Sequence, residues 1–230
     1  VQERADRELL EGELHALYRN KRQGKQLFFQ YSTQVAGIAA IGQNFVGFGT
    51  AFVDLDRDGW EDLVVSNGHV IRHPYRCGVR QKPVVLRNRG DGRFADITSQ
   101  GGDYFRNEHC GRGLAVGDLD NDGRPDLVIS HVNEPVALLR NVAGEGQHWL
   151  GVELVGRERR DVVGARLLVE TGSKRLTRFA RGGGSYLSSA DRRHLIGLGG
   201  ADGVVRLTVE WPSGEPLTQR SDRRLLALAR

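Results

Sequence analysis

The sequence predicts an all-β protein that joins a set of repeated short-strand units to a second, smaller β domain. A nine-residue acidic motif starts at Asp54 and again at Asp118, each time between apolar runs of strand length. A short apolar run that ends in Arg-Asn occurs three times between residues 17 and 141. From about residue 147 both motifs stop, and stretches of alternating apolar and polar residues follow. These three observations predict the fold class.

The acidic motif has the composition of a calcium-binding loop. Each copy places Asp at positions 1, 3, 5 and 9 and Gly at position 6, so alternate side chains of a tight loop converge. Such carboxylates repel one another unless a cation lies among them, and a carbonyl at position 7 completes the oxygen ligands. The sequence therefore predicts two Ca2+ ions. The predicted ligands are Asp54, Asp56, Asp58, Asp62 and the carbonyl of Trp60, and Asp118, Asp120, Asp122, Asp126 and the carbonyl of Arg124. The alternative is a solvated acidic turn at each place.

The sequence around each motif argues against an EF-hand. An EF-hand carries a bidentate Glu at position 12, where this chain has Val65 and Ile129. The flanking runs are short and apolar, which is typical of strands and not of helices. The sequence therefore predicts a strand–calcium loop–strand hairpin, used twice, with strands near residues 50–53, 63–65, 114–116 and 127–129.

The Arg-Asn motif extends each hairpin into a longer repeat. It ends the apolar runs 17–20, 85–88 and 138–141, and a polar turn with glycine and a further apolar stretch follow the clearest copy. Each full unit begins with Gly-x-Gly, at residues 47–49 and 111–113. Four short strands at a period of tens of residues are typical of a β-propeller blade. We assign residues 17–146 to these blades, as a half repeat and two repeats in a partial propeller or an open array.

Two further segments flank the blades. An N-terminal helix is assigned to residues 1–16, although its apolar stripe of Leu10, Leu14, Leu17 and Tyr18 extends to residue 18. Residues 147–230 are predicted to form a small β-sandwich-like domain whose core includes Trp149, Leu167, Leu207 and Trp211, with an exposed glycine turn at 182–184. Its strands are expected near residues 148–155, 162–169, 174–181, 194–198, 203–211 and 225–228.

The blades resemble FG-GAP/VCBS repeats, which carry the same acidic loops at hairpin turns of integrin-type propellers. The last segment resembles the ASPIC/UnbV domain in Trp149-Leu150, Gly164-Ala165-Arg166, Gly184 to Ser189, Gly197-Leu198-Gly199 and Trp211-Pro212-Ser213-Gly214. The first resemblance covers about residues 17–145 and the second about 147–217. This layout is similar to that of the cartilage acidic protein family. The resemblance implies an extracellular, calcium-binding protein, and a cyclisation role has been suggested for some bacterial relatives.

Composition narrows the function classes. The 230 residues are 39% hydrophobic and 27% charged, which is typical of a globular protein, and no apolar run approaches membrane-spanning length. The net charge is +4, but the basic residues are scattered, so nucleic-acid binding is not favoured. The chain begins at Val1 and contains no Met, so we expect an upstream part that is missing or cleaved.

The cysteines and histidines leave alternatives open. Cys77 and Cys110 form either one disulfide or two free thiols. Nearby His69, His73 and His109 lie at no recognised zinc spacing, so loop histidines are preferred to a soft-metal site. Residues 67–83 form the longest irregular stretch of the blades, either a binding loop or a plain crossover.

Three functional hypotheses follow. The preferred one is an extracellular binding or adhesion module for a protein or glycan. The second is a cyclase-type enzyme, with His109, His131, His194 and Tyr186 as acid–base candidates, which a deep pocket lined by His109, His131 and Arg112 would support. The third is a subunit of an extracellular filament or surface assembly, with self-association through sheet edges.

Overall fold

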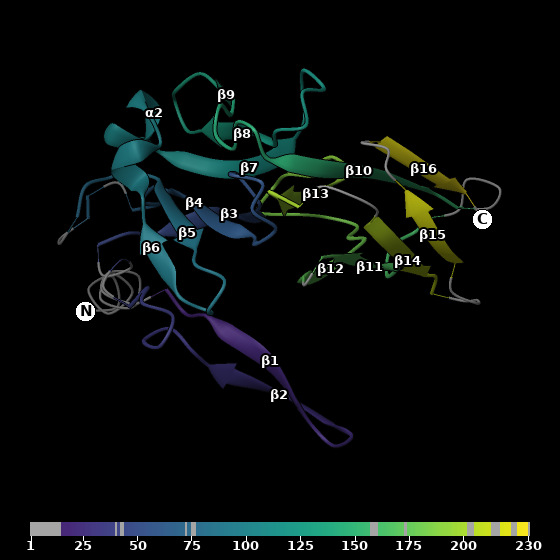
Figure 1. Cartoon of the computed structure of the whole chain (residues 1–230). Helices are drawn as coiled ribbons and strands as arrows, with labels where there is room; N and C mark the ends of the chain where they lie inside the picture. The colour runs from purple at the N-terminus through teal and green to yellow at the C-terminus, as the bar shows by residue number, and fades with distance from the viewer. Residues whose placement is uncertain are drawn as a thin grey trace. The chain divides into compact units, whose positions relative to one another are not determined.

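The structure, a computed structural model, describes residues 15–39, 41, 44–71, 73–74, 77–156, 161–172, 174–201, 205–212, 217–221 and 225–229. These residues form an all-β protein of several small sheets (Figure 1). The predicted helix falls almost entirely on residues 1–14, which lie outside the described residues. Tyr18, the last member of its apolar stripe, begins the first strand instead. The all-β prediction is therefore confirmed.

The chain divides into two compact units that do not follow the sequence order. The first unit contains residues 1–52, 62–114 and 129–137, and the second contains residues 53–61, 115–128 and 138–230. Each acidic loop thus belongs, for the most part, to the same unit as the C-terminal β segment. The predicted boundary at 146/147 stays a prediction.

The first repeat forms a four-stranded antiparallel sheet of the kind that makes one propeller blade. Its order is β3 (Gly47–Val53), β4 (Asp62–Asn67), β5 (Val84–Asn88) and β6 (Phe94–Asp96). In the register, Leu63 lies opposite Leu86 and Val65 opposite Val84. Ile38 packs with these four residues into one core cluster. The first acidic loop joins β3 to β4, so the predicted strand–loop–strand hairpin is confirmed.

The second repeat has the same order in its first three strands. They are β7 (Gly111–Gly117), β8 (Asp126–His131) and β9 (Ala137–Leu139). A 3-10 turn, η1 (Thr98–Gln100), and a short helix, α2 (Asp103–Arg106), connect the two repeats. Before the first repeat, β1 (Tyr18–Gln23) and β2 (Gln26–Tyr31) form a two-stranded hairpin, as the half repeat predicts.

The C-terminal segment forms two further sheets around a common core. One has the order β12 (Lys174–Phe179), β11 (Arg166–Thr171), β14 (Val205–Glu210) and β15 (Leu217–Ser221), and the other the order β13 (His194–Gly199), β10 (His148–Val155) and β16 (Leu225–Ala229). Both contribute to one buried cluster, Leu150, Val152 and Ile196 from one sheet and Leu167, Val169, Leu207 and Val209 from the other. β15 is a strand that the sequence patterns did not predict.

Two sequence-based expectations for this segment are wrong. The strand expected over 162–169 begins only at Arg166, because Gly164 adopts a φ of 90° in a turn closed by Ala165 N–H donating to Val162 at 3.0 Å. Trp149 is half-buried and lies outside the core cluster. Its neighbour Leu150 points into the core, and successive strand residues face opposite sides. Leu167, Leu207 and Trp211 are buried, and residues 182–184 are exposed, as expected.

Candidate metal centre

The two acidic loops share one backbone conformation. The fourth position is left-handed in both, with φ of 58° at Arg57 and 59° at Asn121, and the glycine at position 6 has φ of 95° or 80°. In each loop this glycine donates its N–H to Oδ2 of the first Asp at 2.9 Å. The Asp at position 5 of each loop donates its backbone N–H to Oδ1 of the Asp at position 3, at 3.3 Å in both loops. The sequence repeat is therefore a structural repeat.

The first loop gathers three carboxylates. Oxygens of Asp54, Asp56 and Asp58 all lie within 4.8 Å of one another. Asp54 is only 5% exposed, and its Oδ1 has no hydrogen-bond partner, although its Oδ2 accepts two N–H groups. Burial raises the pKa of Asp54 to about 6, and the charge of Asp58 adds to that effect, while Arg178 and the two N–H donors oppose it. A buried carboxylate oxygen without a partner is costly, and a cation would compensate it.

Strands of the C-terminal segment bond to two backbone carbonyls and one carboxylate of this first loop. Lys174 and Arg178 of β12 donate to the carbonyls of Asp58 and Gly59, at 2.5 and 3.0 Å. Gly197 of β13 donates its N–H to Oδ2 of Asp54 at 3.0 Å. These contacts lie within the second compact unit and fix the loop conformation that brings the carboxylates together. Two basic residues of β12 thus bind carbonyl oxygens of the acidic loop.

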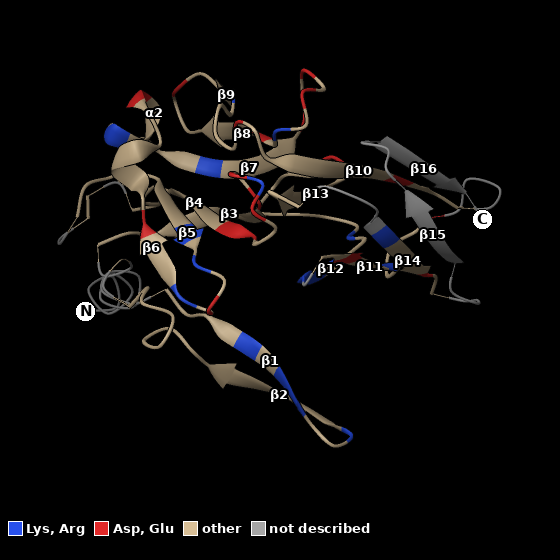
Figure 2. Ribbon diagram, in the orientation of Figure 1, with Lys and Arg blue, Asp and Glu red and all other residues tan. Residues whose placement is uncertain are grey.

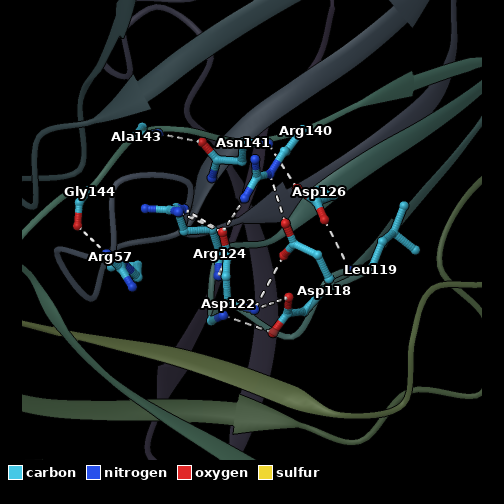
Figure 3. A network of polar contacts seen from close by, with 12 residues as sticks. Arg57, Asp118, Leu119, Asp122, Arg124, Asp126, Arg140, Asn141, Ala143 and Gly144 are labelled. Atoms are coloured by element: carbon cyan, nitrogen blue, oxygen red, sulfur yellow. Dashed lines mark hydrogen bonds and ion pairs between the residues drawn. The ribbon is translucent and has the colours of Figure 1, made fainter.

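The second loop has its own acidic cluster, formed by Asp118, Asp120 and Asp126. Asp118 and Asp126 are buried, and every oxygen of these two carboxylates accepts a backbone N–H: Asp118 from Asp122 and Gly123, and Asp126 from Leu119 and Asn141 (Figure 3). The second loop therefore lacks the unpartnered oxygen that marks the first.

Two arginines neutralise the second loop. Asp122 accepts from Nε and Nη2 of Arg124 at 2.9 and 2.6 Å, and Arg140 pairs with Asp120 at 2.7 Å and with Asp122 at 3.4 Å (Figure 3). Burial by itself would raise the pKa of Asp122, but the hydrogen bonds from Arg124 and the charges of Arg124 and Arg140 together lower it. Asp122 was a predicted ligand, but it lies outside the cluster. The sequence signal for Arg140 was present, since it belongs to the Arg-Asn motif, but its role as a counter-charge was missed.

The ninth-position Asp of each loop makes a contact outside the acidic loop. Asp62 lies outside the first cluster, and its Oδ1 accepts the N–H of Asn88 at 2.8 Å. Asp126 makes the same contact with Asn141 at 2.8 Å, so the ninth-position Asp links each acidic loop to its Arg-Asn motif. The carbonyls of Trp60 and Arg124 stay predicted ligands. The donor set is made of hard oxygen atoms, which suits Ca2+ and excludes a soft-metal preference at these loops.

The structure also tests the histidine and cysteine candidates of the sequence. Cys77 and Cys110 are not joined by a disulfide, so the disulfide alternative is wrong. Among the described residues, the only groups that bring three or more metal-ligating side chains together are the two acidic ones, which does not support a soft-metal site at His69, His73 and His109. His109 and His131 do come together, with ring centroids 5.3 Å apart.

The hydrogen bonds of these two histidines are structural. His131 Nδ1 lies 2.7 Å from the carbonyl of Pro135 and therefore donates, so its Nε2 accepts from the Tyr104 hydroxyl at 2.7 Å. His109 places its ring nitrogens 3.0 Å from Glu134 and 3.2 Å from the carbonyl of Tyr104. Burial, with the charge of Glu134, raises the pKa of Tyr104 above its ordinary value.

Arg112, the third predicted pocket residue, makes different contacts. Its guanidinium lies 4.2 Å from the centre of the Phe48 ring and donates to the carbonyls of Gly68 and His69. Tyr186 and His194, the other acid–base candidates, belong to the second compact unit, whereas His109 and His131 belong to the first. The contacts of Arg112 and the two histidines are accounted for by the fold itself.

Comparison with known proteins supports the division seen in the strands. A family model described as an FG-GAP-like repeat matches residues 75–129, which include the second acidic loop, and one described as ASPIC and UnbV matches residues 155–223. The chain joins an FG-GAP-like repeat to an ASPIC/UnbV domain. The resemblance stated from the sequence motifs is therefore confirmed.

This chain is similar to three proteins named cartilage acidic protein 1. The Homo sapiens protein is 28% identical over 170 residues, which cover 72% of this chain and 25% of the relative. The Mus musculus protein is 30% identical over 170 residues, which again cover 72% of this chain and 25% of the relative. The Xenopus tropicalis protein is 31% identical over 122 residues, 51% of this chain and 19% of the relative. The chain thus spans about a quarter of the length of the first two relatives.

Proposed function

We propose that this chain is an extracellular calcium-binding repeat protein that acts as a binding or adhesion module for a protein or glycan. The observation that carries the calcium assignment is the buried, unpartnered Oδ1 of Asp54, which lies in a cluster of three carboxylates. The FG-GAP-like repeat and the similarity to cartilage acidic protein 1 support the extracellular setting. None of the helices in the described segments has the length and apolar character needed to cross a membrane.

The first loop is the stronger of the two proposed sites. Asp54, Asp56 and Asp58 would hold a Ca2+ ion there, since a cation supplies the partner that Oδ1 of Asp54 lacks. In the second loop Asp118, Asp120 and Asp126 would hold the ion, but it competes with Arg140 for Asp120. We therefore infer two Ca2+ sites of unequal affinity.

Calcium would act on the structure of the binding module. An ion that neutralises the first loop stabilises the loop conformation, and β12 and β13 of the ASPIC/UnbV domain are bonded to that loop. Ion binding is thereby coupled to the order of the C-terminal strands. A protein or glycan would then meet a rigid set of loops, which reduces the entropy cost of binding.

The test is calcium titration of the whole chain by isothermal calorimetry, with melting temperature as a second readout. We expect calcium to bind and to raise the melting temperature, and Asp54→Asn to remove the tighter site. Asp103→Asn is the matched control, because its side chain is 92% exposed and lies on α2. Calcium binding that Asp54→Asn leaves unchanged, or no calcium binding at all, would contradict the proposal.

The partner class is tested separately with the calcium-loaded chain. Glycan arrays and immobilised extracellular-matrix proteins are probed with calcium and with chelator. Retention that depends on calcium and is lost in Asp54→Asn supports the binding role. Equal retention of the native chain and the variant would contradict the coupling between the ion and the binding surface.

A further inference from the structure

The hairpin β1–β2 is a structural copy of the hairpin β5–β6. In β5–β6 the register places Asn88 opposite Phe94 and Leu86 opposite Asp96. In β1–β2 it places Asn20 opposite Phe29 and Tyr18 opposite Tyr31. The Asn of the Arg-Asn motif thus faces a Phe in both hairpins, although β1 and β2 continue to pair beyond that position, as far as Gln23 opposite Gln26.

Equivalent hydrogen bonds close the two hairpins. Thr33 Oγ1 accepts the N–H of Leu17 at 2.8 Å, and Thr98 Oγ1 accepts the N–H of Val85 at 3.0 Å. The backbone bond from Ser32 N to the carbonyl of Leu17, at 2.8 Å, corresponds to that from Ile97 N to the carbonyl of Val85, at 3.0 Å. The half repeat is therefore the outer strand pair of a blade.

The outer pair of the first blade has a partner strand on its other edge. There β5 pairs with β4, and the N–H of Asn88 donates to Asp62 of β4. The second repeat has the same bond, between Asn141 and Asp126. In the sheets formed by the described residues, β1 pairs with β2 alone.

The hydrogen-bonding pattern of the β1–β2 pair directs the backbone N–H of Asn20 to the edge of β1 that faces away from β2, which we call the open edge. Residues alternate along an antiparallel pair between facing the partner strand and facing away from it. Ser32 bonds to Leu17, so the 17/32 and 19/30 pairs face each other, and the N–H groups of Tyr18 and Asn20 point away from β2. Asn20 therefore presents to the open edge the N–H that Asn88 and Asn141 use to bond a ninth-position Asp.

One face of the hairpin carries four exposed apolar side chains beside Asn20 and Arg22. Tyr18, Leu27, Phe29 and Tyr31 share this face, and they are 56%, 60%, 69% and 49% exposed. At the equivalent positions of the first blade, Leu86 is 2% exposed and Phe94 packs against the core cluster that contains Leu63 and Val65 of β4. Four exposed apolar side chains that share one face of a two-stranded hairpin indicate an interaction site.

The charge of the hairpin points to the kind of partner. Figure 2 shows basic residues along β1 and at the turn to β2, and the sequence from residue 18 to 31 contains Arg19, Lys21, Arg22 and Lys25 but no acidic residue. A positively charged hairpin favours an acidic partner.

We propose that the open edge of β1 and the face that carries Tyr18 and Phe29 bind a strand–acidic loop–strand hairpin of an FG-GAP-like repeat other than the two in this chain. The bound hairpin takes the place that β3–β4 takes beside β5, its ninth-position Asp accepts the N–H of Asn20, and its apolar residues cover Tyr18 and Phe29. The inference rests on the proposed function only in naming a partner for the binding role.

The test uses a labelled synthetic peptide with the sequence of residues 61–68, which contains β4 and Asp62 but not the DxDxDG residues. It is titrated into the whole chain in the presence of chelator, so that failure here is separate from failure of the calcium sites. We expect saturable binding and a shift of the Asn20 amide resonance in an NMR spectrum. The Asp62→Asn peptide is expected to bind about tenfold more weakly, because a charge-assisted hydrogen bond becomes a neutral one.

Variants of the chain locate the surface. Phe29→Asp is expected to weaken peptide binding by about tenfold, because it places a charge on the covered face. Phe28→Asp is the control, since Phe28 is 44% exposed on the opposite face of the hairpin and should change binding by less than about twofold. No binding, or binding that Phe29→Asp leaves unchanged, would overturn the inference. A chain that does not bind the peptide, but sediments as a dimer that Phe29→Asp dissociates, would show that the occupant is a second copy and would also overturn it.

Discussion

Gly197 donates its backbone N–H to Oδ2 of Asp54 at 3.0 Å, across 143 positions of the sequence. Gly197 lies in β13 of the ASPIC/UnbV domain, and Asp54 is the first residue of the first acidic loop. The bond leaves Oδ1 of Asp54 as the oxygen available to an ion. One contact thus connects the C-terminal strands to the proposed calcium site.

A side chain at position 197 should disturb this connection. A Cβ at Gly197 would lie 2.5 Å from Cα of Arg57 and would overlap the Asp54 carboxylate. We expect Gly197→Ala to lower the free energy of unfolding by about 2 kcal/mol and to weaken calcium binding, because the loop backbone must move. Denaturant unfolding and calorimetry measure the two effects. Gly200→Ala is the control, since a Cβ there has no neighbour within 4 Å. Equal stability of the two variants would contradict the prediction.

A side chain at Gly123 of the second loop should also lower the stability of the protein. Gly123 has a φ of 80°, and a Cβ there would overlap the indole of Trp149. Gly146 has a similar φ of 76° but no neighbour within 4 Å of a Cβ. Gly146→Ala should cost about 1 kcal/mol from backbone strain alone, and Gly123→Ala should cost about 2 kcal/mol more, because the ring must shift. Melting curves of both variants check this difference, and similar losses would show that the Trp149 contact is unimportant.

Removing Arg140 should favour an ion in the second loop. The Arg140 guanidinium pairs with Asp120 and Asp122, so it competes with a cation for the same oxygens. Arg140→Gln is expected to raise the calcium affinity of the weaker site, but only by about a few-fold, because the Arg140 side chain is exposed and the competing pairs are screened by solvent. Arg175→Gln, which removes an exposed partner of Glu170, is the matched control. Calorimetry that finds an unchanged or lower affinity for Arg140→Gln would contradict this role.

His194 should make the protein less stable in mild acid. Burial lowers the pKa of His194 below its ordinary value of 6.5, and the charges of Arg178 and Arg181 add to that effect, while Asp191 opposes it. The folded state therefore favours the neutral ring, so this contribution to stability is present above pH 6.5 and is lost as the pH falls toward the folded-state pKa. The melting temperature of the native chain should fall more steeply below pH 6.5 than that of His194→Gln.

The control for this pH dependence is a histidine on the surface. His148→Gln, at an exposed position of β10, should leave the slope of melting temperature against pH as it is in the native chain. Parallel curves for the native chain and His194→Gln would show that His194 does not contribute.

Local patterns predicted much of this fold. The period of the apolar runs and the Asp-Gly turns identified both acidic hairpins and the Arg-Asn strands, because strand alternation and turn chemistry depend on neighbouring residues. The same local logic misled at residues 162–165, where an apolar run is interrupted by the turn at Gly164. It also misled at Trp149, because alternation shows that neighbouring residues face opposite sides but not which side faces the core.

The sequence by itself determined the all-β class, the repeated acidic loops and the oxygen chemistry that suits calcium, since residue type and spacing are enough for these. Only the tertiary structure decided that Asp54 keeps an unpartnered buried oxygen while Arg140 neutralises Asp120, and that no disulfide joins Cys77 to Cys110. Two loops with the same spacing of Asp and Gly differ because their surroundings come from residues far away in the chain, such as Gly197. Burial and charge compensation are set by those distant contacts, and no local pattern of Asp and Gly contains them.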